Sequence, residues 1–289
     1  MLSKPQMLGL LYALKNQYKI TDSEEIKFFL DLKENIDQRK RTIQKLVEEG
    51  KRRPRFFAAG NLKRLIEEGK YYHRDKLLIA QKGHVVGLNL RDWGLTEVPE
   101  SIGNLKYLQT LDLSYNQFKT LPDSIERLIS LKSLSLNDNF NLDTIPSSIT
   151  TLAQKIFSQK YIRRGLAPKE ALALALLEIL SGRVMKKFPE GEKLGELDSI
   201  WHHYRVNKKG YLTEIYLLLD EFMHIVLFPK EICGLRNLEV LILLSQGLKF
   251  IPFCIKRLKK LKILDLSLNN IKSIPSSISE MSTLEEFKI

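Results

Sequence analysis

Apolar and polar residues alternate in short stretches that recur along the chain at a nearly constant spacing. In the clearest of them, Leu111 and Leu113 flank Asp112. Alternation with a period of two predicts a strand with one buried face. A proline marks the same point of each repeat: Pro99, Pro122, Pro146, Pro229, Pro252 and Pro275. With the exception of one long interval, neighbouring prolines are separated by a fixed period in the low twenties, which predicts an α/β solenoid.

The long interval, from Pro146 to Pro229, divides the pattern into two parts. It exceeds one repeat by more than twice the repeat length, which predicts two short arrays separated by a foreign segment. Parallel strands are expected at four leucine pairs: Leu111-Leu113, Leu134-Leu136, Leu241-Leu243 and Leu264-Leu266. One long solenoid with a loop insertion is the alternative. The predicted domains are a basic helical segment, the first array, a helical insertion and the second array, at residues 1–77, 78–152, 153–203 and 204–289.

Each array is predicted to begin with a β-hairpin. A turn that contains lysine and glycine, ending at Gly83 in one array and Gly210 in the other, precedes the first apolar strand. Where the clearest repeat has Asn116, these first repeats carry Trp93 and Met223. An atypical first repeat is expected, because the open end of a solenoid exposes an edge strand and half a core.

Helices are predicted on both sides of the first array. Residues 22–49 begin with capping side chains and two glutamates, and Gly50 follows them. Residues 168–181 begin at a proline, end before a glycine and are apolar almost all round, which predicts a buried helix. Further helices are expected at 62–68, 153–164 and 192–201.

Residues 108–128 follow the pattern LxxLxLxxNxLxxLPxxIxxL, with Phe118 at one of its leucine positions. The amide of Asn116 is placed to satisfy backbone groups of the adjacent turn. This pattern resembles that of leucine-rich repeats, and its length and LPxxI step resemble the Ras-group repeats of cytoplasmic scaffold proteins. The resemblance implies parallel strands on a concave face. It also implies a non-enzymatic protein-interaction module or scaffold, in signalling of the small-GTPase type.

The strand period places alternate side chains on the concave surface. In the first array these positions are polar: Asn89, Arg91, Asp112, Ser114, Ser135 and Asn137. In the second array they are mostly apolar: Tyr216, Leu218, Val240, Ile242, Leu244, Ile263, Asp265 and Ser267. A contiguous apolar patch seldom faces water, so either the protein's own helices cover it or a partner protein docks there. We predict that these residues bind a partner, with Tyr216, Ile242 and Leu244 as anchors.

The net charge of +12 is uneven, since residues 1–75 carry 17 Lys/Arg against 11 Asp/Glu. The densest stretch consists of Arg39, Lys40, Arg41, Lys45, Lys51, Arg52, Arg53 and Arg55. Such a stretch is typical of the solvated face of a basic helix, and it also suits the phosphates of nucleic acid or of an acidic membrane. Binding of nucleic acid or an acidic membrane surface is therefore the alternative function.

Motifs for enzymatic chemistry are absent: the chain has no P-loop, dinucleotide-binding, zinc-protease, hydrolase or EF-hand signature. We therefore expect no enzyme, no cofactor and no metal. Cys233 and Cys254 match no disulfide framework, so we expect reduced thiols in a cytoplasmic protein. No apolar stretch is long enough to predict a membrane span. The apolar residues 7–14 lack the small-residue cleavage site of a secreted protein.

Overall fold

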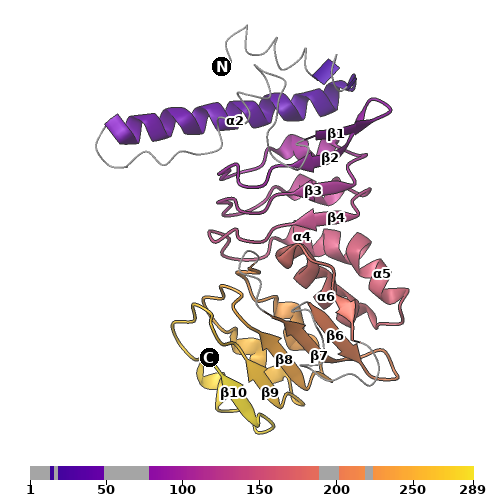
Figure 1. The fold of residues 1–289 in the computed structure, drawn as a ribbon, viewed down its shortest axis with the longest axis vertical. Helices are drawn as coiled ribbons and strands as arrows, with labels where there is room; N and C mark the ends of the chain where they lie inside the picture. Colours follow the sequence, from indigo (N-terminus) through magenta and orange to yellow (C-terminus); the bar gives the residue numbers. More distant parts are fainter. Residues whose placement is uncertain (1–13, 16–18, 49–77, 189–201, 219–223) are drawn as a thin grey trace. The chain divides into compact units, whose positions relative to one another are not determined.

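The computed structural model describes residues 14–15, 19–48, 78–188, 202–218 and 224–289 (Figure 1). The chain divides into two compact units. One contains residues 1–134, 139–141 and 146–148, and the other contains 135–138, 142–145 and 149–289. The predicted domain boundaries at 77/78, 152/153 and 203/204 stay predictions.

The first sheet has the strand order β1-β2-β3-β4. Its strands are β1 (Leu78–Gln81), β2 (His84–Asn89), β3 (Thr110–Asp112) and β4 (Ser133–Ser135). β1 and β2 form the predicted antiparallel hairpin, and β2 pairs in parallel with β3, with Leu88 opposite Leu111. After β2 and after β3 the chain returns through a short 3-10 helix that follows an extended proline: η2 (Glu100–Asn104) and η3 (Asp123–Arg127).

The second sheet has the order β10-β9-β8-β7-β6-β5. Its strands are β5 (Lys186–Lys187), β6 (His203–Val206), β7 (Leu212–Leu217), β8 (Val240–Leu243), β9 (Ile263–Asp265) and β10 (Glu286–Lys288). The predicted hairpin precedes the parallel strands here as well, since β6 and β7 are antiparallel and β7 to β10 pair in parallel. The returns are η5 (Lys230–Gly234), η6 (Phe253–Arg257) and η7 (Ser276–Ile278). The sequence pattern did not predict β5, which pairs in parallel with β6.

The predicted strands are confirmed, but three of them are one residue shorter than expected. Leu113, Leu136 and Leu266 directly follow β3, β4 and β9, and all three are buried. Two positions further on, the backbone of these repeats turns into the left-handed region, at Tyr115 (φ 57°), Asp138 (59°) and Leu268 (59°). This recurrent turn ends the ladder of hydrogen bonds between strands.

The asparagine after this turn bonds to the backbone, as the sequence predicts. Asn116 Nδ2 donates to the carbonyls of Leu90, Leu113 and Ser114 at 2.9–3.1 Å, and its Oδ1 accepts from the amide of Leu95 at 2.9 Å. Asn269 makes the equivalent bonds in the second sheet. Trp93 takes this position in the first repeat and is buried. Met223 lies outside the described residues.

Two predicted helices are confirmed: α2 (Ser23–Glu48) and α6 (Pro168–Ser181). The predicted helix 153–164 is wrong at its start. Helical structure begins as α4 (Ser147–Leu152) and continues through a π-helical turn (Ala153–Phe157) into α5 (Ser158–Ile162). Here the return after Pro146 is α-helical rather than 3-10, so it runs directly into the insertion. The predicted helices 62–68 and 192–201 lie outside the described residues.

In each hairpin, a backbone amide of the second strand donates a hydrogen bond to a buried glutamate of a helix. Oε2 of Glu25, in the first turn of α2, accepts a hydrogen bond from the amide of Val85 at 3.0 Å. Oε2 of Glu170, in the first turn of α6, accepts one from the amide of Leu212 at 3.1 Å. Both glutamates are buried, and burial raises the pKa of each carboxyl. In each array, a glutamate thus links a helix to the second strand of the hairpin by a hydrogen bond.

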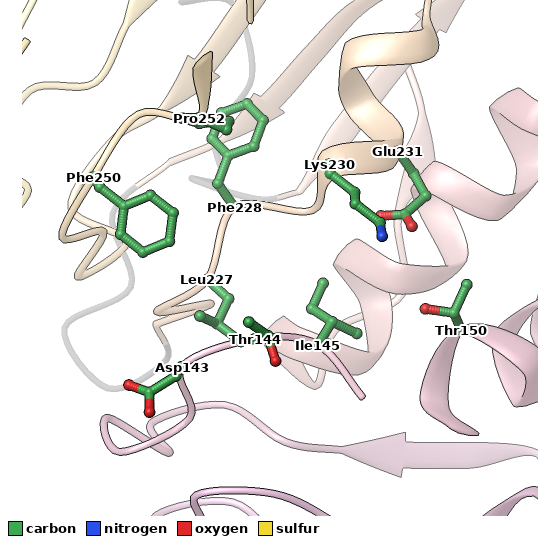
Figure 2. A pocket seen from close by; sticks show the side chains of 10 residues that line it. All are labelled: Asp143, Thr144, Ile145, Thr150, Leu227, Phe228, Lys230, Glu231, Phe250 and Pro252. Atoms are coloured by element: carbon green, nitrogen blue, oxygen red, sulfur yellow. The ribbon is translucent and has the colours of Figure 1, made fainter. Parts of the chain in front are cut away.

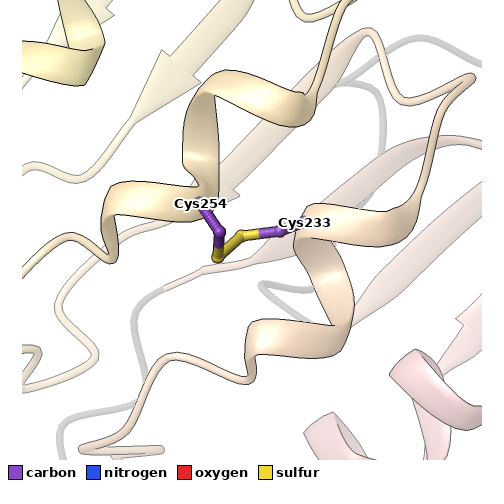
Figure 3. The surroundings of a disulfide bond; sticks show 2 residues. All are labelled: Cys233 and Cys254. Carbon is purple, nitrogen blue, oxygen red and sulfur yellow. A yellow bond between two sulfur atoms is a disulfide. The ribbon is translucent and has the colours of Figure 1, made fainter.

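The cysteines correct the sequence analysis. Cys233 in η5 and Cys254 in η6 form a disulfide bond, with their Cα atoms 5.8 Å apart (Figure 3). The expectation of reduced thiols is therefore wrong for this structure. Their separation of 21 residues, close to the repeat length, brings the two return segments of neighbouring repeats together. The spacing matches no disulfide framework, but its closeness to the repeat period places both cysteines in return segments of adjacent repeats.

Removing this bond should destabilise the second array. A disulfide that closes a loop of this length stabilises the folded state by about 3 kcal/mol in the chain-entropy account. We expect the double variant Cys233→Ala/Cys254→Ala to lose about that much in the free energy of unfolding, measured by urea titration under oxidising conditions. A reductant should lower the wild type to the same level and leave the variant unchanged. Equal stability of the oxidised wild type and the variant would contradict the bond.

Candidate functional site

The predicted binding surface of the second array lies on one face of β7, β8 and β9. Leu241, Leu243 and Leu264 are fully buried, so their neighbours in the strands must point to the opposite face. The register places those neighbours in two rows across the sheet. One row contains Glu214, Val240, Ile263 and Glu286, and the other contains Tyr216, Ile242, Asp265 and Lys288.

The centre of this face is apolar and half-buried. Val240, Ile242 and Ile263 lie side by side, and Leu218 and Leu244 are half-buried as well. Three of the four row ends are charged, and none of the three was among the residues predicted from the sequence: Glu214, Glu286 and Lys288. The period-two alternation predicts that these three side chains also lie on this face, because they occupy the same alternate strand positions as the predicted residues.

The protein itself covers one part of this face. Phe188, directly after β5, contacts Tyr216 and His203, with ring centroids 5.8 and 5.5 Å apart. The guanidinium of Arg205 lies 4.4 Å from the centroid of the Phe188 ring. Tyr216 is only 6% exposed as a result. The covering residue comes from the predicted insertion, but from the segment after β5 and not from one of its helices. Tyr216 is therefore less accessible than the anchor role requires.

A hydrogen-bonded group orders the covered edge. Glu214 Oε2 accepts hydrogen bonds from the hydroxyl of Tyr216 at 2.7 Å and from Nε of Arg205 at 2.8 Å. Burial and the bond to Glu214 raise the pKa of Tyr216 well above its usual value. The phenol therefore stays neutral and donates to the carboxylate throughout the physiological pH range.

Several predicted polar residues have a structural role. Asp112 Oδ1 accepts from the backbone amide of Ser114 at 2.9 Å, and Asp265 Oδ1 does the same for Ser267 at 2.9 Å. Asn89 Oδ1 accepts from the amide of Arg91 at 3.0 Å. These side chains close the turn at the end of each strand. Ser114 is fully buried, so it lies beneath the surface on which binding was predicted.

Asn137 is also placed differently from the prediction. It is fully buried, and Gly182 at the end of α6 covers it and Ser135 so closely that a Cβ at Gly182 would lie 2.9 Å from Asn137 Oδ1. Its Nδ2 donates to Asp138 Oδ2 at 2.6 Å, and Asp138 Oδ1 lies 2.5 Å from Nδ1 of His224. Asn137 is thus part of an internal polar network and not of an open surface.

The second unit also contains a pocket of about 210 Å³ that the sequence analysis missed (Figure 2). Segments that precede or follow three different prolines line it, together with α4: Asp143, Thr144, Ile145, Thr150, Leu227, Phe228, Lys230, Glu231, Phe250 and Pro252. Only the stacking of three separate turns brings these segments together. No sequence motif marks such a pocket.

Within the described part of the chain, no helix is long and apolar enough to cross a bilayer. In that same part, no group of three or more His, Cys, Asp or Glu side chains is arranged to hold a metal ion. His202 and His203 are buried, with His203 against Phe188. The basic residues 39–41 and 45 lie in α2, but their side chains, like residues 51–55, are outside the described part.

Two family models match the chain. The leucine-rich repeat region model matches residues 82–158, and the leucine-rich repeat model matches residues 260–281. The TMV resistance protein N of Nicotiana glutinosa is 50% identical over 58 residues, which are 20% of this chain and 5% of that protein. Tsukushi of Mus musculus is 29% identical over 189 residues, 64% of this chain and 51% of that protein. The chain thus spans about half or much less of these relatives' length.

Solved structures with some similarity include an LRR protein of Leptospira interrogans, at 23% identity and a TM-score of 0.25, covering 70% of this chain and 67% of that chain. The leucine-rich repeat domain of the type III effector XopL is 19% identical with a TM-score of 0.27, covering 72% and 77%. The family models do not distinguish a Ras-group subtype. The two matched segments, the regular repeat period, the parallel strands and the bonds of Asn116 and Asn269 identify residues 82–158 and 260–281 as leucine-rich repeats.

Proposed function

We propose that this chain is a non-enzymatic protein-interaction module that binds a partner protein on the strand face of its second array. One observation carries the proposal: Val240, Ile242 and Ile263 form a contiguous, half-buried apolar centre, and charged side chains stand at three of the four row ends around it. Exposed apolar patches with a polar rim are typical of protein interfaces. Leucine-rich repeats present such faces on a rigid stack, which lowers the entropic cost of binding.

The contribution of each predicted residue follows from its exposure. Ile242 and Leu244 are the proposed anchors, with Leu218, Val240 and Ile263 around them. Asp265 and Ser267 contribute to the rim. Tyr216 supports the face from below Phe188 rather than touching the partner. Within the first array, Asn89, Arg91 and Asp112 remain half-exposed and stay predictions.

The experiment is affinity capture with the full chain as bait. We expect the double variant Ile242→Asp/Leu244→Asp to lose the partner that the wild type retains, because two buried charges in an apolar interface cost several kcal/mol. Ile274→Asp is the matched control, since Ile274 is 52% exposed and lies outside this face. It should keep the partner.

Circular dichroism and a thermal melt accompany the capture. A folded double variant that keeps every partner would show that the face is not the binding site. A double variant that unfolds would show that the face is internal core. Only a folded variant that has lost the partner supports the proposal.

The other functions considered gain no support. The comparisons do not point to small-GTPase signalling or to nucleic-acid binding. The cytoplasmic location stays a prediction, and the Cys233–Cys254 pair offers a check on it. Because cytosolic thiols are kept reduced, alkylation during lysis should modify both cysteines in a cytosolic protein and neither in an oxidising compartment.

A further inference from the structure

The pocket in the second unit combines an apolar wall with a carboxylate. Ile145, Leu227, Phe228 and Pro252 supply apolar surface. In Figure 2, Lys230 and Glu231 lie at one side of the pocket and Phe250 at the other. Phe250 is 47% exposed, so its ring remains accessible to a bound group. An arrangement of this kind suits a ligand with an alkyl stem and one polar end.

One oxygen of the carboxylate at this pocket lacks a hydrogen-bond partner. Glu231 Oε2 is buried, and no hydrogen-bond donor reaches it among the described residues. The neighbouring Lys230 makes no ion pair with it within that same set of residues, and its side chain is exposed. A buried acceptor without a donor destabilises the protein, and a charged one does so more strongly. A cationic group in the pocket would stabilise the partly buried carboxylate by charge attraction.

The charges and the volume limit the occupant. The lining includes two carboxylates, Asp143 and Glu231, and one ammonium, Lys230, which leaves a net charge of −1 (two negative, one positive). A cation therefore suits the site better than an anion. The volume of about 210 Å³ is below the roughly 300–1,000 Å³ of pockets for drug-sized molecules. It suits a single side chain.

We propose that this pocket receives a lysine or arginine side chain of the partner protein. The alkyl stem lies along Ile145, Leu227 and Phe228, and the cationic end donates a hydrogen bond to the accessible side of the Glu231 carboxylate. This inference rests on the proposed function as a protein-interaction module. It adds a second, charge-specific contact, which is separate from the apolar strand face.

The test uses Nα-acetyl-lysine methylamide as the probe and its norleucine counterpart as the uncharged control. Binding to the full chain is followed by NMR of the methyl groups of isotope-labelled isoleucine, with Ile145 as the reporter in the pocket. We expect the lysine probe to shift the Ile145 signal and to bind at least tenfold more tightly than the norleucine probe. The factor is that of a charge-assisted hydrogen bond.

The variants assign the effect to the pocket. Glu231→Gln should weaken the lysine probe about tenfold or more and leave the norleucine probe unchanged. Glu285→Gln, which removes an exposed carboxylate elsewhere, should bind both probes like the wild type. Phe250→Ala is a second variant that removes an exposed wall of the pocket, and it should weaken both probes.

The inference is overturned if the Ile145 signal of the wild type does not shift at tens of millimolar lysine probe. It is also overturned if the wild type binds the lysine and norleucine probes with equal affinity, or if Glu231→Gln and Phe250→Ala both bind the lysine probe as tightly as the wild type. The outcome is independent of the strand face, since Ile242→Asp/Leu244→Asp should still bind the probe. If the Ile242→Asp/Leu244→Asp variant loses the partner but the wild type does not bind the lysine probe, only the pocket proposal is refuted. If the wild type binds the lysine probe but the Ile242→Asp/Leu244→Asp variant retains every partner, only the strand-face proposal is refuted.

Discussion

Replacing Leu264 by alanine should lower the free energy of unfolding by about 2–5 kcal/mol. Leu264 is fully buried in β9, which lies between β8 and β10. Truncation leaves a cavity that the neighbouring strands cannot close without giving up their own hydrogen bonds. The loss should extend to the adjacent repeats, because each repeat is stable only through its contacts with its neighbours.

Urea unfolding followed by circular dichroism measures this change. Leu268→Ala is the matched control in the same repeat, since Leu268 is 68% exposed. Its substitution should change stability by about 0.5 kcal/mol or less. Hydrogen exchange should show faster opening of β8 and β10 in Leu264→Ala. Unfolding of Leu264→Ala at the same urea concentration as the wild type would contradict the assignment of Leu264 to the core.

Replacing Asn116 by alanine should cost about 3–5 kcal/mol, because it leaves several buried backbone groups without a partner. Asn116 is 3% exposed, and its amide bonds to three carbonyls and one backbone amide. Asn116→Asp should be at least as destabilising as alanine. A carboxylate oxygen would then face the carbonyls of Leu90, Leu113 and Ser114 in place of a donor.

Thermal unfolding of the wild type, Asn116→Ala and Asn116→Asp ranks the three proteins by stability. Asn270→Ala serves as the control, since Asn270 is exposed and adjacent to Asn269. It should melt like the wild type. A stability of Asn116→Asp equal to that of the wild type would mean that the Nδ2 bonds do not hold neighbouring repeats together.

The repeats could be predicted because their signals are local and periodic. Leu111 and Leu113 alternate with polar residues, and Asn116 follows at a constant distance. Each repeat packs only on the next, so the pattern within a single repeat determines both the strand and its neighbour. Gly83 and Gly210 marked the hairpins in the same way, because both turns have a positive φ, at 81° and 77°.

The candidate site was predicted only in part. Alternation correctly separated Leu241 and Leu243 from Ile242, since strand geometry alone decides which face a side chain occupies. It did not show that Phe188 covers Tyr216 or that Gly182 covers Asn137. Those contacts come from the insertion, whose position on the sheet no repeat pattern describes.

The sequence by itself thus determined the repeat, its strands, the asparagine bonds and the two hairpins, all of which depend on residues within one or two turns. Only the tertiary structure decided the Cys233–Cys254 bond, the hydrogen bonds of Glu25 and Glu170 to the hairpins, and the pocket at Glu231. Each of these joins segments from different turns or from a helix 42 or 60 residues away. Such pairings depend on how turns stack, and the burial that makes Glu25, Glu170 and Glu231 significant exists only after the stack has formed.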